Sequence, residues 1–157
     1  MKKYLQKKLN NEKGMTLIEL LAVIVIIAII AAIAIPAIGN IIDNSRVGAI
    51  KSDGQNALQA AELLLIDQPK IFTSAKTTIV KEDLISKYLD DAGSFDEDSS
   101  FTITRNTAGQ LVLTAIGKVG SVQVQFNAAG KGAIDDLENN DDAGDAPGPG
   151  AVGVIAR

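Results

Sequence analysis

The 157-residue chain contains no cysteine, no histidine and no tryptophan, and only 4% of its residues are aromatic. Without cysteine no disulfide can form, so any folded region relies on its apolar core. Without histidine and cysteine, imidazole acid–base chemistry and His/Cys metal sites are excluded. The phosphate-binding loop that ends in Gly-Lys-Ser/Thr is absent, as are Ser-x-x-Lys and Gly-x-Ser-x-Gly. We therefore expect no catalytic residues, no metal site and no cofactor.

Charge is missing altogether from one long segment near the N-terminus. The residues from Leu20 to Ile38 form a run of 19 apolar residues, and a single carboxylate, Glu19, stands directly before it. As an α-helix this run would be about 28 Å long, which is enough to cross the hydrocarbon core of a bilayer. An ionisable group next to such a segment is costly and indicates a function. The apolar run therefore predicts a transmembrane helix, and Glu19 is its candidate functional residue.

The charges that are present divide at residue 14. Five lysines and Glu12 give the first 14 residues a net charge of +4, while the remainder holds ten basic and eighteen acidic residues, or −8. Lysines ahead of an apolar span favour a cytoplasmic location for that end. We therefore expect a single-pass membrane protein with a cytoplasmic leader and an acidic head outside. The head's net negative charge and few aromatics argue against direct binding of nucleic acid.

The residues around this boundary carry a recognisable motif. Lys13-Gly14-Met15-Thr16-Leu17-Ile18-Glu19-Leu20 resembles the cleavage and methylation motif of type IV pilins and pseudopilins. The resemblance implies that a prepilin peptidase cuts between Gly14 and Met15, and that the Met15 nitrogen is then methylated. Met15 stands where phenylalanine is commonest in that family. Glu19, four residues past the new terminus, is the residue implied to set subunit register during assembly.

The resemblance extends over roughly residues 13–45. Pro36 and Gly39 fall where the family often interrupts its helix, and proline removes one backbone hydrogen bond from a helix interior. The sequence leaves open a simple kink or a weak point that lets the helix melt in a stretched filament. Secretory signal peptides differ, because their shorter apolar segment precedes the cleavage site.

The resemblance implies a structural subunit, a pilin that polymerises with identical subunits into a type IV pilus at the cell surface. Adhesion, twitching motility and competence are the associated functions. Its implied partners are the prepilin peptidase, a platform membrane protein and an assembly ATPase. One alternative is a pseudopilin of a competence (DNA-uptake) or type II secretion-like apparatus, in which nucleic acid is contacted only indirectly. An alternative of another class is a membrane-anchored binding module that keeps its leader.

Hydrophobic periodicity predicts the fold beyond the membrane. The helix continues from Met15 to about Ile66, because apolar residues recur every three or four positions between Ile50 and Leu65, and Pro69 then ends it. Residues 80–89 predict a short helix. Alternating runs at 101–104, 111–114 and 122–126 predict strands, with turns at 106–109 and 117–120. The expected fold is α+β: a long helical spine, transmembrane in its first half and amphipathic in its second, covered by a small antiparallel β-meander.

This pattern divides the chain into four parts. Residues 1–14 are the leader, 15–39 the transmembrane and assembly helix, and 40–134 the extracytoplasmic head, which includes the second half of the spine. Residues 135–157 are rich in acid, glycine and proline, which predicts a flexible tail. Its aspartates leave a calcium site as an alternative, although their spacing does not match the twelve-residue calcium loop.

Overall fold

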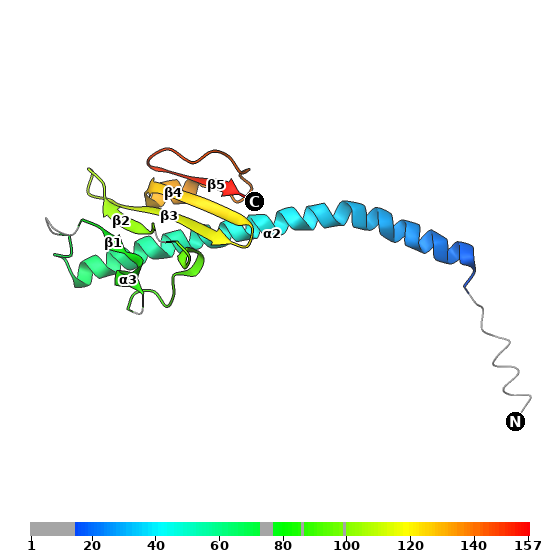
Figure 1. Ribbon diagram of the computed structural model, residues 1–157, viewed down its shortest axis with the longest axis horizontal. Helices are drawn as coiled ribbons and strands as arrows, with labels where there is room; N and C mark the ends of the chain where they lie inside the picture. The colour runs from blue at the N-terminus through cyan, green and yellow to red at the C-terminus, as the bar shows by residue number, and fades with distance from the viewer. Residues whose placement is uncertain (1–14, 73–76, 86, 99) are drawn as a thin grey trace, which may run out of the picture. The chain divides into compact units, whose positions relative to one another are not determined.

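The computed structural model describes residues 15–72, 77–85, 87–98 and 100–157. The predicted leader, residues 1–14, lies outside the described residues. The chain forms two compact units, an N-terminal unit that ends at Asn40 and a head unit that comprises Ile41–Arg157. Helices and strands are labelled as in Figure 1.

The predicted helical spine is present as α2, which comprises the 51 residues Leu17–Asp67. Its last backbone hydrogen bond joins Gln68 N to Leu64 O at 2.7 Å, and Pro69 follows. Proline disfavours helical geometry in the residue before it, so the helix ends here. The boundaries that periodicity and Pro69 predict are thus confirmed to within two residues.

The expected break at Pro36 and Gly39 is absent from α2, which is helical through both residues. Proline takes one hydrogen bond from the helix, the one that would reach the carbonyl of Ala32, and the remaining ladder stays intact. A single chain therefore accommodates Pro36 without losing the helix. Local melting at this point would need an additional load.

The head unit consists of a five-stranded antiparallel sheet on the second half of α2, with strand order β1-β2-β3-β4-β5. The predicted α+β class is confirmed. The strands are β1 (Ile79–Val80), β2 (Thr102–Arg105), β3 (Leu111–Val119), β4 (Val122–Ala129) and β5 (Ala151–Ala156). The short helices of the head are α3 (Lys81–Leu84), the 3₁₀ turn η1 (Gly93–Phe95) and α4 (Lys131–Asp136).

One face of the sheet packs on the apolar stripe of α2. Ile50, Leu58 and Leu64 of the helix are at most 2% exposed, as are Ile103 and Phe126 of the sheet. These side chains belong to one continuous core that also contains the T-shaped ring pair of Phe95 and Phe126. The apolar positions that the sequence predicts as one face of the helix, from Ile50 to Leu65, are buried under the sheet, except that Leu65 is only half-buried.

The helix and sheet approach closely at two glycines. A Cβ on Gly54 of α2 would lie 2.8 Å from the Phe126 ring, and one on Gly117 of β3 would collide with Ile50. A side chain at either position would push the two layers apart. Glycine is required at both positions by packing rather than by backbone conformation.

Two predicted elements of the head are wrong in extent. The helix expected over 80–89 is only the turn of α3, because Val80 pairs with Thr102 in the sheet and Ile85 is already extended. The turn expected at 117–120 lies later, with Gly120 at φ 63° and Ser121 between β3 and β4. Gly117 was read as part of a turn, but it lies within β3. A glycine occurs in this strand because Ile50 of α2 leaves no room for a side chain.

The prediction of a flexible tail over residues 135–157 is wrong for residues 151–156. Residues 151–156 form β5, which pairs with β4 between Gln123 and Asn127, and Val154 is 2% exposed. Lys51 of α2 donates to the carbonyls of Asp135 and Leu137 at 2.8 and 2.9 Å. The composition of the tail does not predict these contacts, because they join residues that are far apart in the sequence.

Candidate functional site

The most informative polar contacts of the N-terminal unit lie at the start of α2. The Glu19 carboxylate accepts hydrogen bonds from the backbone N–H and the hydroxyl of Thr16, both at 2.7 Å. In return, the Glu19 N–H donates to the Thr16 hydroxyl at 3.3 Å. This reciprocal arrangement is a capping box, in which two otherwise unpaired donors at a helix N-terminus are satisfied. Glu19 therefore stabilises the first turn of its own helix.

Thr16 is a capping residue that the sequence analysis did not identify. The signal was available, because Thr16-Leu17-Ile18-Glu19 directly before an apolar run is the sequence signature of a capping box. Met15 precedes Thr16 and is 69% exposed. The nitrogen implied to be freed and methylated thus belongs to the residue next to the capping contact. Gly14, the other residue of the expected cleavage site, lies outside the described residues.

The segment behind this cap is apolar and uncovered. Every large aliphatic side chain from Leu20 to Ile38 is exposed, from 45% at Val23 to 70% at Ile33. By length and composition this part of α2 is sufficient to cross a membrane. Soluble monomers rarely expose so large an apolar surface, which indicates a membrane or a protein partner.

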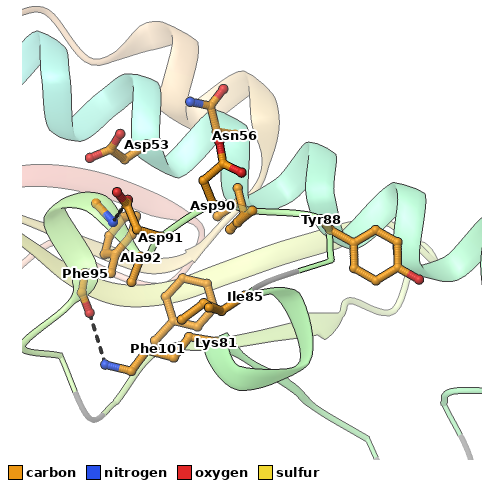
Figure 2. Close-up of a pocket in the computed structure, with 13 residues that line it drawn as sticks. Asp53, Asn56, Lys81, Ile85, Tyr88, Asp90, Asp91, Ala92, Phe95 and Phe101 are labelled. Carbon is orange, nitrogen blue, oxygen red and sulfur yellow. Dashed lines mark hydrogen bonds between the residues drawn. The ribbon is translucent and has the colours of Figure 1, made fainter.

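A cleft of about 370 Å³ in the head lies beside α2 (Figure 2). Asp53 and Asn56 of α2 line one side of it, and the buried Phe95 and Phe101 are among its other lining residues. Two of its charged side chains bind backbone: Asp53 accepts from Ser94 N at 2.8 Å, and Lys81 donates to Asp96 O at 2.6 Å. The Asp53 contact holds the connection between α3 and β2 against α2, and the Lys81 contact joins that connection to α3.

The described polar contacts of the cleft are structural. Within the described ranges, no three acidic, histidine or cysteine side chains are placed to hold a metal ion. Of its carboxylates, Asp91 also accepts a backbone hydrogen bond, from Gly93 N at 2.7 Å. The arrangement thus stabilises a loop.

A second charged cluster lies at the C-terminal end of α2. The Asp67 carboxylate accepts from Lys87 Nζ at 2.5 Å and from the Tyr88 hydroxyl at 2.7 Å. The hydrogen bond from Lys87, then that from Tyr88, lowers the pKa of Asp67 below its ordinary value. The same bond to Asp67 raises the pKa of Lys87. All three groups are substantially in contact with solvent, so the cluster is a surface tie between α2 and the segment after α3.

Comparison with known proteins finds the N-terminal part of the chain. A family model described as the prokaryotic N-terminal methylation motif matches residues 9–35, which include Gly14, Met15 and Glu19. No curated protein and no solved structure matches the chain significantly. The motif implies processing by a prepilin peptidase. The chain therefore carries the prokaryotic N-terminal methylation motif, which is typical of type IV pilins and pseudopilins, on a long helix packed against an antiparallel sheet in a pilin-like α+β fold.

Proposed function

We propose that this protein is a pilin, a structural subunit that polymerises through its N-terminal helix into a type IV pilus. The observation that carries the proposal is the apolar run Leu20–Ile38, which is uncovered in the single chain and is preceded by one carboxylate. Before assembly the run crosses the membrane, with the leader in the cytoplasm and the head outside. In the filament it exchanges lipid for the helices of neighbouring copies.

Cleavage between Gly14 and Met15 would create the second charge that assembly needs. The free Met15 amine is positive and lies, like Glu19, just before the apolar run and therefore near the membrane interface. Ionisable groups attached to a membrane-spanning segment are costly there without a partner, although less so than at its centre. A neighbouring Glu19 can meet this amine if the incoming helix is staggered along the axis, and opposite charges attract more strongly where water is excluded. The apolar side chains supply contact area, whereas the charge pair selects one stagger.

The capping box refines this mechanism. Among the described residues the Glu19 carboxylate bonds to Thr16, and one of its oxygens, Oε2, accepts both of these bonds. A carboxylate can accept about four hydrogen bonds, so an amine from a neighbour can be added without breaking the cap. Head-to-tail use of two different surfaces then produces an open helical polymer rather than a closed dimer.

The proposal includes removal of the leader as a condition for assembly. The leader carries five lysines that would remain on the cytoplasmic side and resist withdrawal of the helix from the membrane. A prepilin peptidase, a platform membrane protein and an assembly ATPase are the partners that this route requires. No catalytic role is assigned to the chain itself.

Electron microscopy of cells that carry the gene, with a deletion strain as control, tests the proposal. Long surface filaments that bind antibody raised against the head are the expected result. Filaments confined to the envelope would instead indicate the pseudopilin of a secretion or competence apparatus. A protein that stays in the membrane fraction with its leader and forms no filament would contradict assembly and favour an anchored binding module.

A further inference from the structure

The sheet of the head unit ends in two edge strands, β1 and β5, and both are protected. At β1 the backbone N–H of Val80 donates to the Asp83 carboxylate at 3.1 Å. No residue of β5 is exposed, although an edge strand normally has one open side. Edge strands present unpaired N–H and C=O groups with which other strands can pair. Protection matters more at β5, because this strand has six residues whereas β1 has two.

The composition of β5 suits it to pair with another strand. Residues Ala151–Ala156 include no charged residue and no proline, and three of the six are valine or isoleucine. Short segments of this kind, with high β-propensity and no charge, pair readily with strands of other chains. Two copies of β5 laid against each other would meet no repulsion between like charges. An open β5 edge would therefore be able to pair with itself.

The segment that precedes β5 lies along this edge. It comprises residues 138–150, and we name it the edge strap. Gly144 N donates to Val154 O at 2.9 Å, and a Cβ on Gly153 would lie 3.5 Å from the Pro147 side chain. Positions in the strap rise as their partners in β5 fall, so the two segments run antiparallel. Figure 1 shows the strap beside β5 on the side away from β4.

The edge strap covers β5 without extending the sheet. Pro147 and Pro149 have no backbone N–H to offer to a further strand. Asn127 of β4 fixes this part of the strap by donating from Nδ2 to Pro147 O at 2.9 Å. Proline and charged side chains are the means by which proteins make an edge unsuitable for pairing. The strap has both, and its exposed acidic residues are Glu138, Asp141, Asp142 and Asp145.

The last residue of the chain, Arg157, closes the other end of the strap. Its Nη2 donates to the carbonyls of Asn139, at 2.8 Å, and Asp141. Its Nη1 donates to Asn44 Oδ1 of α2 at 2.8 Å. A guanidinium can make these bonds together because its donors are arranged in a rigid, planar fork. One side chain thus joins the strap, the end of β5 and the long helix.

We propose that the edge strap prevents β5 from pairing with β5 of a second copy, and that Arg157 holds the strap closed. The inference goes beyond the proposed function, because it concerns association of heads through their sheets rather than assembly through the N-terminal helix. It applies equally to a pilin and to a pseudopilin. A closed strap leaves the N-terminal helix as the contact through which copies polymerise.

An opened variant, Gly144→Pro with Arg157→Ala, tests the proposal in the full chain. Proline removes the N–H that Gly144 donates to Val154, and alanine removes the three bonds of Arg157. The matched control is Gly144→Ala with Arg105→Ala. It keeps the N–H, a Cβ at residue 144 meets no atom within 4 Å, and Arg105 is an exposed residue of β2.

Light scattering of the purified chain in detergent, where copies can approach in either orientation, gives the protein mass of each particle. We expect the opened variant to have twice the mass of the unmodified chain, and the control variant to match the unmodified chain. Circular dichroism confirms that each head is folded. If the opened variant does not fold, Arg157→Ala alone is measured in its place. An unchanged mass for the folded variant would overturn the proposal and leave the pilin function intact.

A cysteine scan identifies the surface through which the opened variant associates, because the chain has no cysteine of its own. Val152, Gly153 and Ile155 are replaced by cysteine, one at a time, in the opened and control backgrounds. A disulfide needs Cα atoms about 4.4–6.8 Å apart, a range that opposite residues of paired strands satisfy. We expect covalent dimers in the opened background and none in the control.

Two results of this scan would overturn the proposal. A doubled mass without a disulfide at any of the three positions would show association through another surface. Equal amounts of covalent dimer in both backgrounds would show that β5 is accessible while the strap is closed.

Discussion

Isoleucines of one helix have opposite surroundings in the two units of the chain. Ile33 of the N-terminal unit is 70% exposed, whereas Ile50 of the head unit is fully buried under the sheet. Both lie in α2, and both are aliphatic side chains with the same tendency to leave water. The head satisfies that tendency within one chain. The N-terminal unit has no such cover among the described residues, so its apolar surface requires lipid or other copies.

The two units also treat charge differently. In the head, carboxylates such as Asp53 and Asp67 bind nearby backbone or side-chain donors. The N-terminal unit from Met15 to Asn40 contains a single charged side chain, Glu19, whose described partner is Thr16 three residues before it. Charge in the head thus fixes loops, and charge in the N-terminal unit is restricted to the end where subunits are proposed to meet.

The largest expected effect comes from blocking removal of the leader. Gly14→Glu places a bulky, charged residue at the proposed cleavage position and should abolish processing and filaments altogether. Gly14→Ala is the conservative control and should retain some cleavage. Immunoblots of membrane fractions distinguish the longer uncut chain from the mature one. Filaments made by uncut Gly14→Glu protein would break the link between cleavage and assembly.

Glu19 separates the capping contact from the charge. Glutamine also completes a capping box, so Glu19→Gln keeps the helix start and removes the charge, whereas Glu19→Ala removes both. We expect both variants to insert in the membrane and to lose most filaments in quantitative electron microscopy. If Glu19→Gln assembles normally while Glu19→Ala does not, the cap rather than the charge pair is required.

The contrast between Ile50 and Ile33 predicts an intermediate effect on stability. Ile50→Ala leaves a cavity in the core and should lower the free energy of unfolding of the head by about 2–5 kcal/mol. Ile33→Ala should change it by less than about 0.5 kcal/mol, because Ile33 is 70% exposed in a single copy. Thermal unfolding of the full chain in detergent, followed by circular dichroism, measures both. Equal effects would contradict the division into two units.

The smallest expected effect is a pH dependence at the Asp67 tie. Its lowered pKa means that its contribution is present above the ordinary aspartate value of 3.8 and is lost as the pH falls through the lowered value. Lys87, with a raised pKa, keeps its charge up to and beyond its ordinary value of 10.5. The tie therefore persists between these limits.

Tyr88 provides the readout for that tie. The chain has two tyrosines, Tyr4 in the leader and Tyr88, and no tryptophan, so Tyr88 alone determines the intrinsic fluorescence of the cleaved protein. We expect a fluorescence transition with a midpoint below 3.8 that disappears in Asp67→Asn. A midpoint at or above that value would show that Lys87 and Tyr88 do not hold Asp67 in solution.

The parts of the fold that could be predicted are those marked by hydrophobic periodicity or by a residue that ends a helix. The long helix and its buried stripe follow from apolar spacing and Pro69, and the strands containing Ile103 and Val124 follow from alternation. The continuation of β3 through Gly117 could not be predicted from the sequence. Glycine is needed at this position because Ile50, which is distant in sequence, leaves no room for a Cβ. β5 was missed for the same reason, since its pairing with β4 outweighs the composition around it.

The candidate site shows the same division between local and distant information. Met15 and Glu19 were identified from the motif, and the capping role of Thr16 was present in the local sequence but was not recognised.

The mass of the N-terminal peptide from purified native filaments tests the central claim most directly. Protease digestion and mass spectrometry should find a peptide that begins at Met15 and carries one methyl group on its amine, with no peptide from residues 1–14. Filaments whose subunits begin at Met1, or a protein recovered only as an uncut membrane monomer, would contradict the account.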